Sequence, residues 1–302
     1  MQKTFYSNGK LLLSGEYAIL DGAVGLAVPT KYGQSLHVTE TSSELLEWKS
    51  LDANGAIWFE GIYRLGDLTE ISCSDKSISA TLVQLLTEAK TQNPNFLASS
   101  AGYNVETKLG FTRFWGLGTS STLINNIAQW AEVNAYQLLH NAFGGSGYDI
   151  ACAKHSSPIL YQLDGFAPKV KEISFDPAFK NALYFVYLNQ KKSSKEAIAA
   201  YRNQNFDKNQ LISKVSSLTK RIVSAKTLHE FESLITEHEE VLSDVLGLPP
   251  IKTKLFPDYS GAIKSLGAWG GDFVMVTGSS ADMDYFKSKG YGTIIPYTKM
   301  VL

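Results

Sequence analysis

A glycine-rich segment between an expected strand and a long expected helix carries the strongest chemical signal in this chain. Residues 116–122 read Gly-Leu-Gly-Thr-Ser-Ser-Thr. Glycines allow a sharp turn, and the start of the following helix offers unpaired N–H groups and a positive dipole end, so the segment suits a phosphate. A plain turn with Ser and Thr capping the helix would have the same composition. The segment is neither a P-loop nor a dinucleotide fingerprint, because the residues that complete either motif are missing.

Two other segments place charged side chains beside glycine-rich turns. Residues 7–17 carry Lys10 on an expected strand that ends at Glu16. Residues 266–272 form a second glycine-rich turn that ends at Asp272. A lysine in such a place could contact a transferring phosphoryl group, and a solvated lysine at a strand end is the alternative.

A fourth segment, residues 144–151, places Asp149 before a helix expected to begin at Ile150. A carboxylate can orient an alcohol and accept its proton while the alcohol attacks phosphorus. Lys10 could pair with Asp149 and lower the pKa of its carboxyl group. Asp149 could also cap the helix, and the two roles are compatible.

The elements that must position these residues alternate in the manner of an α+β protein. Strands are expected at residues 9–20, 25–40, 44–52, 56–65 and 101–109, and helices at residues 77–93 and 121–140. The second half predicts a strand at 182–189, helices at 193–203, 211–227 and 228–247, and then helix, strand, helix and strand at 258–267, 271–278, 281–290 and 292–298. We place a domain boundary near residues 165–180, which predicts domains at 1–170 and 171–302.

Composition narrows the class of protein. The chain has 302 residues, of which 44% are hydrophobic, enough for one large domain or two ordinary ones. Its 28 lysine and arginine residues balance 29 aspartate and glutamate residues, so no overall field favours nucleic acid or a membrane surface. Two cysteines are too few for a disulfide framework, and no stretch has the apolar length of a membrane span. We therefore expect a cytoplasmic protein that binds neither nucleic acid nor a membrane.

The three segments, in this order, resemble the three motifs of the GHMP kinases, which include galactokinase and the homoserine, mevalonate and phosphomevalonate kinases. The first resembles P-G-K-x-x-x-x-G-E-[HY], the second P-x-x-x-G-L-G-S-S-A, and the third G-A-G-G-G. The resemblance runs from about residue 7 to the C-terminus. It implies an α+β, two-domain GHMP kinase fold, with an N-terminal domain like ribosomal protein S5 domain 2 and a ferredoxin-like C-terminal domain.

The resemblance also implies roles for individual residues, with ATP and Mg²⁺ as cofactors. Asp149 and Lys10 would be catalytic, and Ser120 would bind the Mg²⁺ ion. The ATP phosphates would lie on Gly116, Leu117, Gly118, Thr119, Ser120 and Ser121. The third motif would comprise Gly267, Ala268, Gly270, Gly271 and Asp272. The acceptor would contact Glu16, Ser146, Gly147, Lys191, Ser194 and Lys195, although a solvated basic loop is the alternative for the last three.

The branch of the superfamily is indicated by two further likenesses. The segment Gly-Ser-Gly-Tyr-Asp-Ile-Ala at residues 145–151, together with Asp272, is similar to phosphomevalonate kinases. Residues 189–195 more loosely resemble a stretch of mevalonate kinases. We therefore expect an ATP-dependent kinase acting on phosphomevalonate or mevalonate. A sugar or other GHMP kinase, a diphosphomevalonate decarboxylase-like enzyme and a non-catalytic nucleotide-binding homologue are the alternatives, and monomer and homodimer both stay open.

The chain departs from the family pattern in ways that bear on the site. Asn8 and Thr112 stand where the first two motifs have proline. Trp269 replaces a glycine of the third motif, so its indole must either fill a pocket or narrow the site. Leu138 stands where mevalonate kinases carry a Glu that binds Mg²⁺. The Mg²⁺ ion would then depend on Ser120, the ATP phosphates and water.

Overall fold

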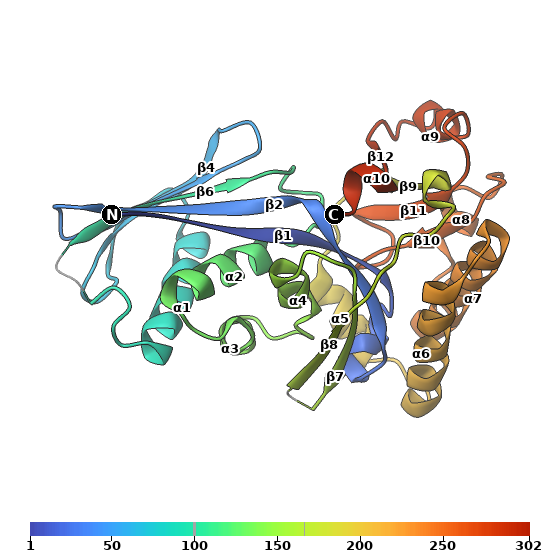
Figure 1. The fold of residues 1–302 in the computed structure, drawn as a ribbon, viewed down its shortest axis with the longest axis horizontal. Helices are drawn as coiled ribbons and strands as arrows, with labels where there is room; N and C mark the ends of the chain where they lie inside the picture. The colour runs from blue at the N-terminus through green and yellow to red at the C-terminus, as the bar shows by residue number, and fades with distance from the viewer. Residues whose placement is uncertain (99–100, 166) are drawn as a thin grey trace. The chain divides into compact units, whose positions relative to one another are not determined.

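The computed structural model describes residues 1–98, 101–165 and 167–302, and their contacts group the chain into two compact units. The first unit comprises Met1–Gly9, Tyr32–Arg113 and Leu117–Lys154, and the second comprises Lys10–Lys31, Phe114–Gly116 and His155–Leu302. The units interleave because the long strands β1 (Gln2–Ser14) and β2 (Gly25–Thr41) each begin in one unit and end in the other (Figure 1). The division of the chain into domains at residue 170 stays a prediction.

The first unit is a mixed sheet packed against helices. Its strands β3 (Leu45–Leu51), β4 (Ile57–Arg64), β5 (Glu70–Cys73) and β6 (Gly102–Leu109) join the end of β2 in the order β5-β4-β3-β6-β2. Only the β3–β6 pair is parallel among these neighbours. The helices are α1 (Lys76–Gln92), α2 (Thr119–Ala131), α3 (Ala135–Ala142) and α4 (Tyr148–Lys154). Trp48 and Phe59 from the sheet share one buried core with Leu85, Ile124 and Ile150 from the helices.

The second unit contains a separate antiparallel sheet in the order β10-β11-β9-β12. Its strands are β9 (Leu183–Tyr187), β10 (Ile263–Ser265), β11 (Phe273–Thr277) and β12 (Ile294–Pro296), and β7 (Ile159–Asp164) pairs with both β8 (Ala167–Glu172) and the start of β2. The helices are α5 (Ser194–Arg202), α6 (Lys208–Ser224), α7 (Leu228–Leu246), α8 (Ile251–Leu255), α9 (Met283–Ser288) and α10 (Tyr297–Met300), with the short turns η1 (Ala18–Asp21) and η2 (Lys180–Ala182). The long helices α6 and α7 run side by side (Figure 1). The predicted α+β class is confirmed, and no described helix is long and apolar enough to cross a membrane.

Local sequence signals explain where several helices begin and end. Ser193 caps α5, and its hydroxyl accepts a hydrogen bond from the Glu196 N–H. Gly247 ends α7 in the left-handed conformation, with φ 64°. The helices expected at 193–203 and 228–247 are confirmed to within one residue at each end.

Two predicted elements were wrong. The single helix expected at residues 121–140 is two helices, because Glu132 adopts a left-handed φ of 56° and Asn134 caps the new helix α3. The helix expected at 258–267 contains the strand β10, in which Ile263 pairs with Val276 of β11. The apolar residues of this segment are spaced as in a helix, but a strand of three residues forms because it pairs with a neighbouring strand and not because of its own propensity.

Candidate functional site

The glycine-rich loop of the first unit ends at the start of α2. Gly118 precedes the helix with φ 93°, a conformation that suits glycine. Its carbonyl accepts hydrogen bonds from the Thr122 N–H and the Ser121 hydroxyl, both at 2.9 Å. Ser120 is exposed in the first turn. The first helical N–H groups have no carbonyl of an earlier turn to bind, so this helix start can accept an anion.

Buried polar side chains hold α2 against β1 and β2 within the first unit. The Thr122 hydroxyl donates to Gln34 Oε1 at 2.6 Å, and Asn126 Nδ2 donates to the Gln34 carbonyl at 2.9 Å. Ser7 donates to Asn126 Oδ1 at 2.7 Å and accepts from Asn125 Nδ2 at 2.8 Å. Satisfied buried networks of this kind fix one arrangement of the helix, because an unpaired partner would be costly.

An apolar cavity of about 280 Å³ lies beside the first turn of α2, entirely within the first unit. It is lined by Gln34, Trp48, Ser50, Trp58, Phe59, Ser77, Ile78, Thr81, Leu82, Leu85, Thr119, Ser120, Leu123 and Phe143. The Arg113 guanidinium lies 4.6 Å from the centre of the Trp58 ring and braces it. Aromatic walls beside a glycine-rich helix start suit a flat heterocycle. This cavity was not predicted from the sequence, because its lining residues have the spacing of ordinary core positions.

Asp149 lies in the first turn of α4. This helix begins at Tyr148, two residues before the expected start at Ile150. The preceding residues Gly144, Gly145 and Gly147 all have positive φ, between 71° and 112°. A carboxylate in a first helical turn is stabilised by the helix dipole. Because Ile150 and Ile124 of α2 share one core, Asp149 and the glycine-rich loop are held by the same packed body.

The residues that could hold Mg²⁺ in the first unit are few. Leu138 is fully buried in the core, so the position that carries a Glu in mevalonate kinases contributes no ligand. Within the described ranges, no group of three or more His, Cys, Asp or Glu side chains forms a metal site. The exposed Ser120 hydroxyl fits an ion that takes its other ligands from nucleotide phosphates and water.

In the second unit, the loop that contains Lys191 and Lys192 is hydrogen-bonded to the third motif. The Asp272 N–H donates to the Gln190 carbonyl at 2.7 Å, and the Leu188 N–H donates to the Asp272 carbonyl at 2.8 Å. Gln190 Nε2 adds a bond to the Gly270 carbonyl at 2.6 Å. Gly271 packs so closely on Lys192 that a Cβ there would lie 2.3 Å from Lys192 Cγ. The loop is thus held in register with the turn that ends at Asp272.

Asp272 is the focus of charge in this part of the second unit. Burial raises the pKa of its carboxyl group, while Lys10 and Lys191 attract the carboxylate and oppose the rise. Its backbone has φ 52°, a strained value for an aspartate. Ammonium groups of this kind can bind an anion.

Gly116 lies against Asp272. A Cβ at Gly116 would come within 2.3 Å of Asp272 Oδ2, and its φ is 68°. We expect Gly116→Ala to lower the melting temperature more than Gly247→Ala, because Gly247 has a similar φ of 64° but open space around it. Thermal unfolding of both variants separates the clash from the backbone cost, which is about 1 kcal/mol for a left-handed alanine. Equal losses of melting temperature would mean that the Asp272 side chain moves away from the added Cβ without a cost in stability.

The remaining predicted site residues lie in different surroundings. Ser146 is buried before α4, whereas Ser194 and Lys195 are exposed in the first turn of α5. Gly267 and Gly270 have positive φ, and Ala268 is buried. Glu16 is buried in the second unit and forms an ion pair with Lys264 at 2.5 Å. Its role in binding an acceptor stays a prediction.

Trp269 fills a pocket of the second unit. Its side chain packs in one buried cluster with Tyr17, Tyr201, Leu242 and Leu246. Tyr17 itself stacks on Tyr201 with ring centres 5.4 Å apart. Of the two possibilities for this substitution, the structure therefore favours an indole that joins the third motif to the core.

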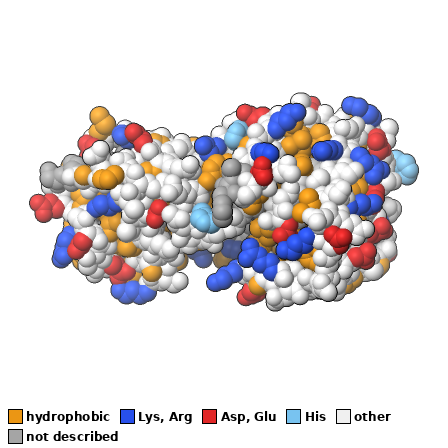
Figure 2. Space-filling view, turned by 90° about the horizontal axis from the view of Figure 1, so that it is seen from below, with side chains coloured by type: hydrophobic (Ala, Val, Ile, Leu, Met, Phe, Trp, Pro, Cys, Tyr) orange, Lys and Arg blue, Asp and Glu red, His pale blue; other side chains and the backbone are white. Residues whose placement is uncertain are grey.

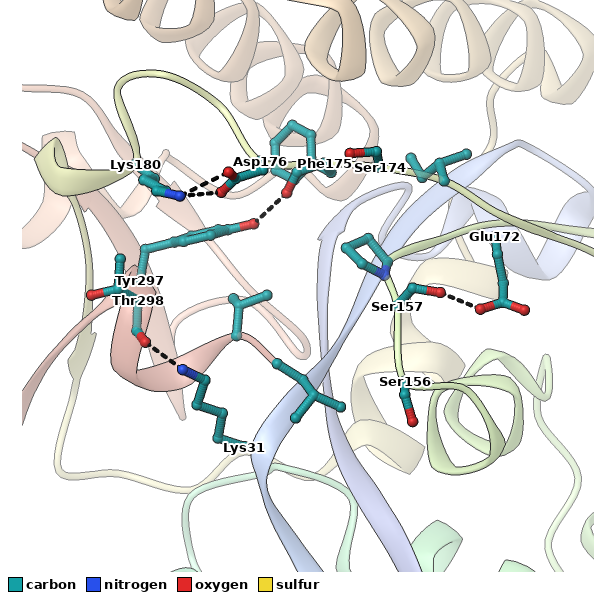
Figure 3. A pocket seen from close by; sticks show the side chains of 14 residues that line it. Lys31, Ser156, Ser157, Glu172, Ser174, Phe175, Asp176, Lys180, Tyr297 and Thr298 are labelled. Atoms are coloured by element: carbon teal, nitrogen blue, oxygen red, sulfur yellow. Dashed lines mark hydrogen bonds and ion pairs between the residues drawn. The ribbon is translucent and has the colours of Figure 1, made fainter.

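A larger pocket of about 670 Å³ in the second unit is lined by none of the motif residues (Figure 3). Its charged groups have polar partners: Lys180 binds Asp176, Glu172 accepts a hydrogen bond from the Ser157 hydroxyl, and Lys31 donates to the Thr298 carbonyl at 2.8 Å. Acidic and basic side chains are interspersed on the face drawn in Figure 2, as the near-zero net charge predicts.

Comparison with known proteins places the fold. No protein-family model matches the chain, and no curated protein does. Solved structures do match: Methanococcus jannaschii mevalonate kinase has a TM-score of 0.72 at 14% identity, covering 97% of this chain and 96% of that one. Streptococcus pneumoniae phosphomevalonate kinase, in complex with phosphomevalonate and AMPPNP, has a TM-score of 0.68 at 14% identity, covering 95% of each chain. Lactococcus lactis galactokinase, complexed with galactose, has a TM-score of 0.69 at 11% identity, covering 98% of this chain and 94% of that one.

The chain has the fold of the GHMP kinases, and the resemblance inferred from its motifs is confirmed at the level of fold. The likeness extends to kinases of an acid, of a phosphorylated acid and of a sugar, so the fold alone does not choose an acceptor.

Proposed function

We propose that this chain is an ATP-dependent kinase that transfers the γ-phosphoryl group to a small anionic acceptor, mevalonate or phosphomevalonate. The observation that carries the proposal is the apolar cavity beside the glycine-rich start of α2, in the same packed body as Asp149. A heterocycle, a chain of phosphates and a carboxylate for the attacking group are what a kinase must accommodate. The known kinases of this fold add support, since one was solved with AMPPNP.

The nucleotide is assigned to the first unit. Its base would stack in the cavity lined by Trp48, Trp58 and Phe59. Its phosphates would accept hydrogen bonds from the N–H groups at the start of α2, where Ser120 is exposed. Mg²⁺ bound to Ser120 and the phosphates would neutralise part of their charge.

The acceptor is assigned an anionic group because two lysines of the second unit act on one carboxylate. Lys10 and Lys191 both attract the carboxylate of Asp272, and ammonium groups in such a place can also bind a phosphate or a carboxylate of the acceptor. A neutral sugar would gain nothing from this charge. The acids named for two of the structural neighbours fit it, since phosphomevalonate carries a phosphate and mevalonate a carboxylate.

In the proposed step, an acceptor oxygen forms a bond to the γ-phosphorus while the bond from phosphorus to the β-phosphate oxygen breaks, leaving ADP. Asp149 orients the acceptor and, when that acceptor is an alcohol, takes its proton. Lys10 stabilises the negative charge on the transferring group. Lys191 holds the anionic group of the acceptor.

The proposal is tested by ADP release with ATP, Mg²⁺ and a panel of acceptors comprising mevalonate, phosphomevalonate, homoserine and galactose. We expect turnover with one of the two isoprenoid acids. Turnover of galactose alone would contradict the anionic acceptor but keep the kinase. Release of CO₂ from diphosphomevalonate would point to a decarboxylase instead.

Lys191→Ala should raise KM for the acceptor by about tenfold while KM for ATP stays within about twofold of wild type. The lost contact is a charge-assisted bond made mainly in the ground state. Lys220→Ala, an exposed lysine on α6, is the matched control. An equal rise in both KM values would place Lys191 with the nucleotide.

A further inference from the structure

Four ionisable side chains meet in the interior of the second unit, and each is at most 2% exposed: Glu16, His238, Glu239 and Lys264. Lys264 Nζ lies 2.5 Å from Glu16 Oε1 and 3.6 Å from Glu239 Oε1. His238 Nε2 lies 3.6 Å from Glu16 Oε2. The proposed kinase step uses none of these contacts.

The cluster holds more carboxyl groups than cations. His238 Nε2 accepts a hydrogen bond from the Gly15 N–H at 3.0 Å, which a charged imidazolium could not do. Burial lowers the pKa of His238 well below its ordinary value, in agreement with a neutral ring. One ammonium therefore faces two carboxyl groups. Because an uncompensated charge is costly in a dry interior, one carboxyl group must keep a proton near neutral pH.

Geometry assigns that proton to Glu239. Within the described part of the chain, Glu16 Oε2 and Glu239 Oε1 both have no hydrogen bond, but Glu16 binds Lys264 Nζ through Oε1 at 2.5 Å, whereas Glu239 Oε1 lies 3.6 Å from the same ammonium group. Glu239 Oε2 accepts from the Ser265 hydroxyl at 2.9 Å. Burial raises the pKa of Glu239 to about 7; the attraction of Lys264 opposes the rise, and Glu16 adds to it.

Other charges near this helix point elsewhere. On α6, Lys214 and Arg221 both bind Glu237, on the more exposed side of α7. Glu232 of α7 accepts a bond from the Thr277 hydroxyl of β11. Among the residues that the structure describes, Lys264 of β10 and Glu16 of the first motif are the charged groups that act on Glu239.

The cluster joins the first motif, which contains Lys10, to the segment before the third motif, which contains Asp272. Glu16 follows strand β1, which carries Lys10, and Lys264 lies on β10, directly before the third motif and Asp272. We propose that Glu239 is a proton-controlled positioning residue, which determines whether Lys264 is held by Glu16 alone or is shared between two carboxylates. Loss of the proton draws Lys264 toward Glu239 and so shifts the first motif relative to the third. The effect on catalysis rests on the proposed kinase function.

The proton on Glu239 determines how the stability of the folded chain changes with pH. A glutamate ionises in the unfolded chain near its ordinary value of 4.5, but Glu239 keeps its proton in the folded chain to about pH 7. The folded state therefore binds more protons between these values, and this group makes stability fall as pH rises through that window. Above about pH 7 its contribution is constant. Glu239→Gln mimics the protonated form, so the variant should match wild type at pH 5 and melt several degrees higher at pH 8.

The test compares wild type, Glu239→Gln and the control Glu240→Gln, an exposed neighbour on the same helix. Melting temperature is measured from pH 5 to pH 8.5, and kcat is measured over the same range. We expect the kcat profile of wild type to change near pH 7 and that change to disappear in Glu239→Gln only. Parallel melting curves for wild type and Glu239→Gln would overturn the proposal, as would identical kcat profiles. A chain without kinase activity would defeat the proposed function but leave the melting comparison intact, so the two failures are distinguishable.

Discussion

Replacing Asp149 by Asn is expected to reduce turnover by about 10²- to 10⁴-fold, while ATP binding is retained. The amide keeps the shape of the side chain but cannot accept the proton of an alcohol. The glycine-rich start of α2 and the apolar cavity, which we assign to ATP, are built from other residues. Binding and chemistry should therefore separate in this variant.

The measurement pairs nucleotide affinity by calorimetry with the initial rate, from one preparation. Asp75→Asn is the matched control, because Asp75 caps α1 in the same unit and accepts bonds from the Ser77 and Ile78 N–H groups. Asparagine caps helices as well as aspartate does, so this variant should keep full activity. If Asp149→Asn were also fully active, Asp149 would serve only the helix that it begins.

Replacing Lys264 by Met is expected to lower the free energy of unfolding by about 3–5 kcal/mol. Lys264 is fully buried, and its removal leaves the Glu16 carboxylate without its cation. The cost arises mainly from that stranded charge, since methionine fills a similar volume. Adding Glu16→Gln removes the charge as well, so the double variant should recover part of the lost stability.

Denaturant unfolding of the three proteins, with Lys287→Met as the control, measures these differences. Lys287 pairs with Asp284 on the surface, where its side chain is 57% exposed, so its loss should cost less than about 1 kcal/mol. A loss for Lys264→Met as small as that of the control would mean that Glu16 takes up a proton without penalty. The ion pair of Lys264 with Glu16 would then contribute little to the free energy of unfolding.

Much of the local structure could be predicted, because its signals lie within a few residues of each other. Gly118 and Gly247 occupy left-handed positions where a Cβ is unfavourable, and Ser193 caps its helix. The order of the three motifs predicted the GHMP kinase fold, which the structural comparisons confirm. The break at Glu132 was missed because apolar periodicity continues across it.

The local turns and the helix caps were determined by the sequence alone, because each rests on residue type and short spacing. The fold was predicted from the sequence through the resemblance of its three motifs, in their order, to the GHMP kinases. The tertiary structure decided which distant residues share an interior. It places Trp269 in a core with Tyr17 and buries Glu16 on Lys264, which lies 248 residues away. No local pattern marks such a pair, because its charges are held together only by the loss of water that folding imposes on both.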